Sequence, residues 1–180
     1  MNIQRTSRLF LLGIVLTLLS LVEARAEVLQ SGRAYAFSMP AEWRYASEPV
    51  ATLMHQRTGA KLTLAHADSA MLKIEHDAAL GSEAYTLQIA DKDIVVRAGS
   101  VKGVNWAMAQ LAQLLSAAGG RPLECATLKS SPRFEHRGLM IDCSRHFRTI
   151  PELESMIDAM NLLRLNVLHL HITDNQGWRL

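Results

Sequence analysis

The sequence contains few cysteines, prolines and aromatic residues. Of its 180 residues, two are cysteine, five are proline and 6% are aromatic. Cys125 and Cys143 allow at most one disulfide, which excludes a disulfide-stapled scaffold, and neither has the spacing of metal ligands. Cys143 alternates with Leu139 and Ile141, which favours a buried apolar role. Spacing alone leaves open whether the two cysteines pair.

The only long hydrophobic run lies at the N-terminus. Residues 1–26 begin with Arg5 and Arg8, continue with the apolar run 9–22 and end in Ala24-Arg25-Ala26. This order is typical of a secretory signal peptide cleaved after Ala26. Because the run is shorter than the ~20 residues of a membrane-spanning helix, we predict a periplasmic or secreted protein. It would contact a membrane only through this segment, if the segment stays uncleaved.

The chain also lacks a charge excess once this segment is removed. Residues 1–26 contain three of the 19 basic residues and one of the 17 acidic residues, so 16 of each remain. A formally neutral chain gives no reason to expect nucleic acid or an anionic membrane surface as a partner.

Residues 27–120 are predicted to form a small α+β domain, an antiparallel sheet covered by one helix. The segment 27–40 is mixed, and the apolar positions of 41–57 follow no clear period. The stretch 84–98 has the pattern of a hairpin, with its turn at 90–93. Apolar residues then recur every three or four positions from Val104 to Leu115, which predicts a helix ending near Gly119-Gly120. The expected strands are 61–65, 72–76, 84–89 and 94–98.

Residues 121–134, with two prolines and two serines, are predicted to be a linker. The segment 135–180 has a strand–helix–strand pattern, which indicates a βαβ unit with parallel strands. Thr149 and Glu152 have the spacing of a capping box, with Pro151 in the first turn, and Asn166 is a plausible helix stop. The apolar second strand, 167–172, suits a strand covered on both faces, as in an α/β barrel. Two strands make only the beginning of such a barrel.

Polar and aromatic side chains follow each strand of this unit, at the edge where α/β proteins collect function. Arg145 offers five fixed donors that suit adjacent sugar hydroxyls, but it also suits a structural ion pair with Asp142 or Asp174. Asp174 could accept hydrogen bonds from hydroxyls while orienting Arg145. His146 and Trp178 are possible supporting residues, Trp178 as an apolar face for a sugar ring.

His169 and His171 form the main alternative. Residues two apart on a strand face the same side, so both imidazoles could bind one metal in a metal-dependent barrel hydrolase. No further ligands can be assigned nearby, which favours packing and hydrogen-bonding roles. We therefore predict no metal and no cofactor.

Two motifs make the assignment more specific. The stretch 137–147, RGLMIDCSRHF, resembles the first barrel strand of the family 20 glycoside hydrolases, the β-N-acetylhexosaminidases. The stretch 166–179, NVLHLHITDNQGWR, resembles their second strand and the turn after it. Residues 27–120 are similar to the small domain before the barrel of this family. The resemblance implies a (β/α)₈ TIM barrel, of which 135–180 would be the incomplete start.

The resemblance also implies an activity, namely exo-acting removal of terminal β-linked N-acetylglucosamine or N-acetylgalactosamine. In this family the acetamido oxygen of the substrate attacks, which departs from the two-carboxylate scheme. A glutamate protonates the leaving oxygen and the preceding aspartate orients the acetamido group. By position, Arg145 resembles the arginine that binds the terminal sugar, Asp174 the acid that supports it, and His171 a histidine of the same network.

No catalytic residue is assigned within this chain. The Asp-Glu pair has no counterpart before Leu180 and is expected beyond it, so the 180 residues alone should be an inactive fragment. The expected partners are amino-sugar oligosaccharides derived from chitin, peptidoglycan or glycoconjugates. The alternative is a non-catalytic sugar-binding or accessory domain, and a metal-dependent hydrolase using His169 and His171 is a more distant possibility.

Overall fold

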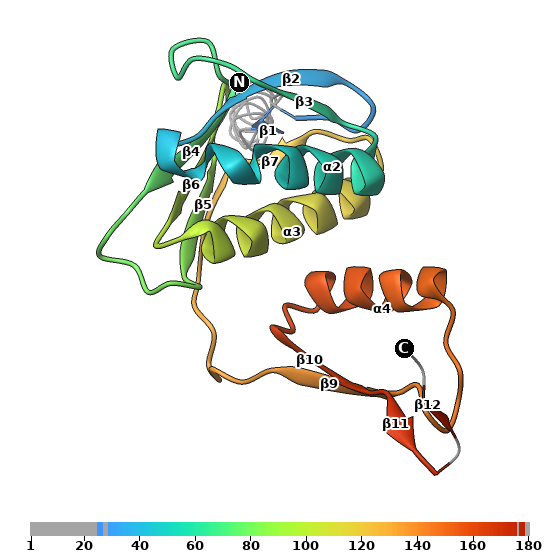
Figure 1. Ribbon diagram of the computed structural model, residues 1–180. Coiled ribbons are helices and arrows are strands. Elements are labelled where there is room, and N and C mark those ends of the chain that lie inside the picture. Colours follow the sequence, from blue (N-terminus) through green and yellow to red (C-terminus); the bar gives the residue numbers. More distant parts are fainter. Residues whose placement is uncertain (1–24, 27–28, 176, 179–180) are drawn as a thin grey trace, which may run out of the picture.

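The first unit of the molecule is a six-stranded mixed sheet. The structure, a computed structural model, describes residues 25–26, 29–175 and 177–178 (Figure 1). The strands lie in the order β3-β2-β4-β6-β5-β8. Neighbours are parallel from β3 to β6, whereas β5 runs antiparallel to both β6 and β8. The strands are β2 (Ala34–Ser38), β3 (Lys61–Leu64), β4 (Leu72–His76), β5 (Tyr85–Ile89), β6 (Ile94–Ala98) and β8 (Ala126–Ser130).

The prediction of an antiparallel sheet is therefore wrong for three of the five strand pairings. The hairpin of β5 and β6 is confirmed, and its turn closes with Ala90 N–H donating to the Asp93 carbonyl at 3.0 Å. Between β2 and β3, however, the chain passes through η1 (Ala41–Ala46) and α2 (Ser47–Thr58). Such a long crossover returns the chain in the same direction and makes the pairing parallel.

Two helices lie side by side against the sheet, α2 and α3 (Val101–Ala118) (Figure 1). The sequence predicted only α3, which ends as expected with Gly119 in the left-handed conformation. The stretch that forms α2 buries only Val50, Met54 and Thr58, every fourth residue, and so narrow a stripe gives a weak periodic signal. The hydrophobic core lies between these helices and the sheet.

The stretch predicted as a linker, 121–134, contributes strands to this unit. Residues 126–130 form β8, the edge strand beside β5, and β7 (Leu123–Glu124) pairs antiparallel with β1 (Arg25–Ala26). Strand β8 is short, and none of its residues is fully buried, although Leu128 packs against the core. The prolines and serines around it therefore outweighed a weak strand signal. The proposed signal peptide lies outside the described residues except for β1. No helix in the described part of the chain is long and apolar enough to span a membrane.

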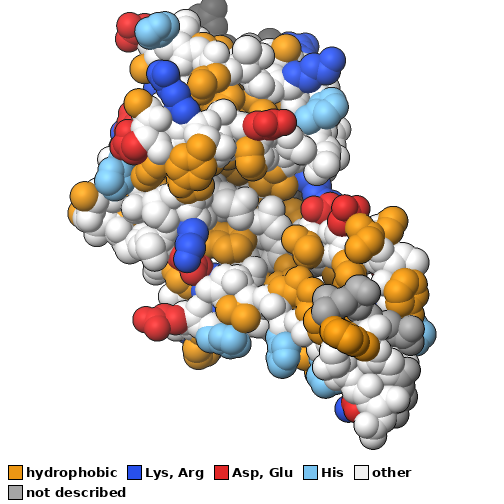
Figure 2. All heavy atoms as spheres, viewed as in Figure 1, with side chains coloured by type: hydrophobic (Ala, Val, Ile, Leu, Met, Phe, Trp, Pro, Cys, Tyr) orange, Lys and Arg blue, Asp and Glu red, His pale blue; other side chains and the backbone are white. Residues whose placement is uncertain are grey.

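The second unit is the predicted βαβ. Strand β9 (Gly138–Asp142) pairs in parallel with β10 (Val167–His171), and α4 (Ile150–Leu162) connects them. A short hairpin follows, made of β11 (Thr173–Asp174) and β12 (Gly177–Trp178). The unit exposes several large apolar side chains, which gather on the lower lobe in Figure 2. They include Met140, Ile150, Ile157, Leu163 and Trp178.

The start of α4 matches the prediction, but its end does not. Thr149 and Glu152 form the capping box, with Pro151 in the first turn. The helix ends at Leu162, and Arg164 then takes φ 58°, so Asn166 is not the helix stop. Both cysteines are free; Cys125 is exposed, and Cys143 is buried as predicted.

Candidate functional site

The predicted sugar-binding residues meet at the carboxyl ends of β9 and β10. The two parallel strands are in register, and Asp142, the last residue of β9, lies beside His171, the last residue of β10. Arg145 and Asp174 follow within three residues of these strand ends. The βαβ topology therefore brings together side chains that are 29 residues apart in sequence.

An ion pair between Arg145 and Asp174 is the centre of this edge. Arg145 Nε and Nη2 both donate to Asp174 Oδ2, at 2.9 and 2.8 Å. Arg145 Nε also lies 3.4 Å from Asp142 Oδ2. The structural ion pairs considered from the sequence thus exist with both aspartates. The Arg145 side chain remains 63% exposed, so the ion pair orients the guanidinium without hiding it from a ligand.

Asp142 and Ser144, which sequence reasoning did not place in the site, shape the loop that carries Arg145. Asp142 Oδ1 accepts the backbone N–H groups of Ser144 at 3.1 Å and Arg145 at 3.0 Å, a turn typical of aspartate. Ser144 is fully buried, and its Oγ donates to the Gly177 carbonyl at 2.8 Å. The carbonyl of His171 accepts from Cys143 N at 2.9 Å. The aspartate just before the turn was the available signal for this arrangement.

Both members of the ion pair remain charged at neutral pH. The backbone N–H of Asn175 donates to Asp174 at 2.7 Å, and this bond, followed by the Arg145 guanidinium, lowers the pKa of Asp174 below its ordinary value of 3.8. Hydrogen bonding to Asp174 in turn raises the pKa of Arg145. The edge therefore presents a fixed cation beside a fixed anion, an arrangement suited to a neutral polyhydroxyl ligand.

His171 borders the same carboxylate. Its Nε2 lies 3.5 Å from Asp174 Oδ2 and, within the described residues, has no hydrogen-bond partner. The side chain is about one-third exposed. The Nε2 atom itself is buried. His171 therefore faces the Asp174 carboxylate with this nitrogen and borders the edge with the exposed part of its ring.

The remaining predicted residues lie less centrally. His146 and His169 are exposed, and the Trp178 side chain, on the hairpin beyond Asp174, is 72% exposed. Across residues 25–26, 29–175 and 177–178, no three His, Cys, Asp or Glu side chains are grouped so that they could hold a metal ion. That His169 and His171 bind no metal stays a prediction.

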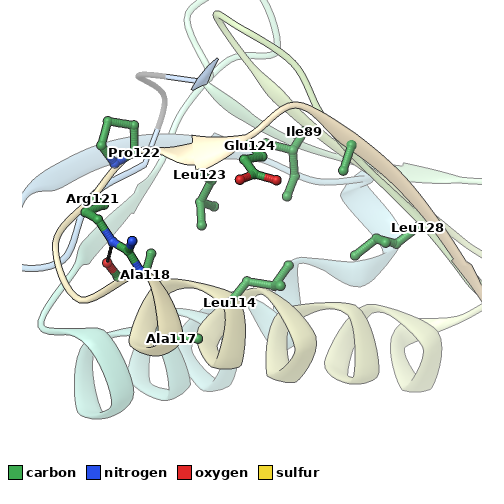
Figure 3. A pocket seen from close by; sticks show the side chains of 10 residues that line it. Ile89, Leu114, Ala117, Ala118, Arg121, Pro122, Leu123, Glu124 and Leu128 are labelled. Carbon is green, nitrogen blue, oxygen red and sulfur yellow. Dashed lines mark hydrogen bonds between the residues drawn. The ribbon is translucent and has the colours of Figure 1, made fainter. Parts of the chain in front are cut away.

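A separate cavity lies in the first unit, between α3 and the sheet. It has a volume of about 330 Å³, and Leu114, Leu123 and Leu128 point into it (Figure 3). Arg121 and Glu124 lie at its margin, and Arg121 Nε donates to the Ala118 carbonyl at 3.0 Å. None of the residues predicted to bind a sugar or a metal lines this cavity. The Arg145–Asp174 edge is therefore the candidate site.

Known proteins resemble both units of the chain. Residues 17–129 match the family described as glycosyl hydrolase family 20, domain 2, and residues 134–180 match its catalytic domain. A beta-hexosaminidase from Akkermansia muciniphila is 34% identical over 163 residues, which cover 87% of this chain and 32% of that protein. A beta-N-acetylhexosaminidase from Cellulomonas fimi is 39% identical over 110 residues, 60% of this chain and 22% of that protein.

The fold is similar to that of solved structures as well. The exo beta-N-acetylglucosaminidase of Vibrio harveyi, solved in complex with N-acetylglucosamine, superposes with a TM-score of 0.72 at 28% identity. The superposed part covers 83% of this chain and 24% of the Vibrio harveyi chain. The chain thus spans about a third or less of the length of these relatives. With a family profile covering more than half of its residues and a second one covering the βαβ unit, the chain belongs to glycosyl hydrolase family 20.

Proposed function

We propose that this chain serves an exo-acting β-N-acetylhexosaminidase by forming part of the pocket for the terminal sugar. The observation that carries the proposal is the ion pair of Arg145 and Asp174 at the carboxyl edge of β9 and β10. Relatives named beta-hexosaminidase, and one solved with N-acetylglucosamine, support the choice of an amino sugar as ligand.

The contacts at this edge support a task for each residue. Asp174 holds the guanidinium of Arg145 through Nε and one N–H of Nη2. Among the described contacts, both N–H groups of Nη1 and the second N–H of Nη2 therefore remain for a ligand. Adjacent ring hydroxyls present acceptors at a spacing that a planar guanidinium can bridge. Asp174 can accept a hydrogen bond from a ligand hydroxyl in return, and His171, whose Nε2 lies 3.5 Å from Asp174 Oδ2, supports this carboxylate.

The proposed chemistry follows from the family. The acetamido oxygen of the substrate attacks the anomeric carbon, a glutamate protonates the leaving oxygen, and the aspartate before it orients the acetamido group, with retention of configuration. The sequence of 180 residues contains no Asp-Glu pair. We therefore propose that residues outside this sequence provide the acid, and that these 180 residues alone bind the sugar without hydrolysing it.

We also propose that the protein is exported. The order of charged, apolar and small residues in 1–26 supports secretion into the periplasm or beyond. There the substrates would be amino-sugar oligosaccharides from chitin, peptidoglycan or glycoconjugates.

The test is to measure binding and turnover in the same sample. The 180-residue chain is incubated with an aryl β-N-acetylglucosaminide in the presence of a chelator, and N-acetylglucosamine binding is measured by calorimetry. We expect binding without release of the aryl group, and binding should be lost in Arg145→Ala. Arg133→Ala, an exposed arginine just before the βαβ unit, is the matched control and should bind like the parent. Equal binding by Arg145→Ala and the parent would contradict the proposed site.

A further inference from the structure

A second polar cluster lies at the opposite ends of β9 and β10, where the two units meet. The carboxylate of Glu83, in the loop before β5, accepts hydrogen bonds from three elements. Trp106 Nε1 on α3 donates to Oε2 at 3.0 Å, and Asn166 Nδ2, just before β10, donates to Oε1 at 2.9 Å. The third donor is Arg137 Nη2, just before β9, which also pairs with Oε2. We call these four side chains the Glu83 hub.

The first unit fixes the position of Glu83. Ser100, the N-cap of α3, donates through Oγ to the Ser82 carbonyl at 2.6 Å. Gly103 on α3 lies so close to the loop that a Cβ there would stand 2.5 Å from the Ala84 carbonyl oxygen. Only glycine allows this approach, which locks the loop carrying Glu83 onto the start of α3.

Arg137 and Asn166 in turn define how β9 meets β10. Asn166 N donates to the Arg137 carbonyl at 2.9 Å, and Arg137 N donates back to Asn166 Oδ1 at 3.0 Å. From this pair the register runs along the strands, from Gly138 beside Val167 to Asp142 beside His171. The hub therefore holds the same two strands whose far ends carry Asp142, Arg145 and Asp174.

We propose that Glu83 is a positioning residue: through Arg137 and Asn166 it sets the register of β9 against β10, and thereby the meeting of Arg145 with Asp174. A slip of one residue would turn every side chain of the slipped strand to the opposite face. It would also separate Arg137 from Asn166 and leave the carboxylate short of donors. The Glu83 and Arg137 side chains are only 11% and 16% exposed, and a buried charge that loses its partner is strongly disfavoured.

The state of Glu83 is consistent with this role. Burial raises the pKa of Glu83, but hydrogen bonds from Asn166, Arg137 and Trp106 outweigh it and lower the pKa below the ordinary value of 4.5. The carboxylate is thus ionised at neutral pH and bonds to all three donors at once. The role of Glu83 in the register is argued from these hydrogen bonds alone. Its consequence for sugar binding rests on the proposed function.

Amide hydrogen exchange on the 180-residue chain tests the inference, with Glu83→Gln as the variant. The amides that report are Asn166 at the hub end and Cys143, which donates to the His171 carbonyl at 2.9 Å, at the far end. We expect exchange at both to speed up roughly tenfold or more, the effect of losing one charge-assisted hydrogen bond. Glu75→Gln, which breaks an exposed pair with Arg97 on the sheet, is the matched control and should leave both amides unchanged.

Comparing exchange at Asn166 with exchange at Cys143 distinguishes the possible results. Faster exchange at Asn166 alone, with Cys143 as protected as in the parent, would overturn the proposal, because the hub would then only join the two units. If Glu83→Gln also speeds exchange in β4 and β6 and so fails to fold, Trp106→Phe, which removes one donor, decides by the same two amides. Exchange needs no sugar, so a parent chain that binds no N-acetylglucosamine would overturn the proposed function and not the role of Glu83.

Discussion

Arg164 combines a strained backbone with useful side-chain contacts, and the two effects can be separated by substitution. It is the non-glycine residue with positive φ in the described ranges, at 58°, just after α4. A left-handed conformation costs a residue with a Cβ about 1–2 kcal/mol, which glycine avoids. The side chain offsets this cost: Nη1 donates to Ser130 Oγ at 2.9 Å, Nη2 pairs with Gln110, and the guanidinium lies 5.5 Å from the Tyr85 ring centroid.

The expected free energies follow from these contacts. Arg164→Ala removes both hydrogen bonds and the cation–π contact but keeps the strain, and should lower the free energy of unfolding by about 2–4 kcal/mol. Arg164→Gly removes the same contacts and relieves the strain. It should therefore be more stable than Arg164→Ala by about 1 kcal/mol, the reverse of the usual order in a helix.

Urea unfolding followed by tryptophan fluorescence measures the difference. The matched control is Ala159→Gly, an exposed position inside α4, where the change from alanine to glycine should instead cost about 1 kcal/mol. If Arg164→Gly proved less stable than Arg164→Ala, the left-handed conformation would not be strained and the reasoning would be refuted.

Three further predictions concern the helices and the interface. Thr149→Ala removes the capping box of α4 and should cost about 1 kcal/mol of unfolding free energy, as seen by urea titration. Leu111→Ala, at a fully buried position of α3, should cost about 2–5 kcal/mol, and a loss under 1 kcal/mol would place Leu111 outside the core. Because the pKa of Glu83 is lowered in the folded chain, its contribution to stability is present above the ordinary value of 4.5 and is lost as the pH falls through the lowered value. Acid titration of Glu83→Gln should lack this loss, and identical profiles for variant and parent would contradict it.

The features that the sequence predicted well depend on local pattern. β4 matches its alternating stretch and β6 its short apolar run, and α3 follows the three-to-four residue spacing of its apolar face. The capping box of Thr149 and Glu152 is a contact between residues three apart. Features that depend only on residues close in sequence can be predicted from that stretch of sequence alone.

The features that the sequence did not predict depend on distant partners. The parallel pairing of β2 with β4 and the recruitment of β8 to the sheet are decided by the sheet as a whole. Asn166 had the character of a helix stop, yet its side chain bonds to Glu83, 83 residues away. No local signal distinguishes Glu83 from an ordinary surface carboxylate, because its partners come from α3 and from the residues just before β9 and β10.

The candidate site falls between these cases. The sequence predicted that Arg145, His171 and Asp174 would gather at one edge, since parallel strands share their carboxyl ends. It did not predict that the side chain of Asp142 would organise the turn or that buried Ser144 would bond to Gly177. The bonds of Asp142 are local, whereas the bond from Ser144 to Gly177 joins the turn to the hairpin 33 residues away.

The location of bound sugar tests the central claim most directly. Intermolecular nuclear Overhauser effects would be recorded between N-acetylglucosamine and the isotope-labelled 180-residue chain. The account predicts contacts from the ring protons of the sugar to Arg145 and His171. Contacts with Leu114, Leu123 and Leu128 of the cavity beside α3, and none at Arg145, would contradict it.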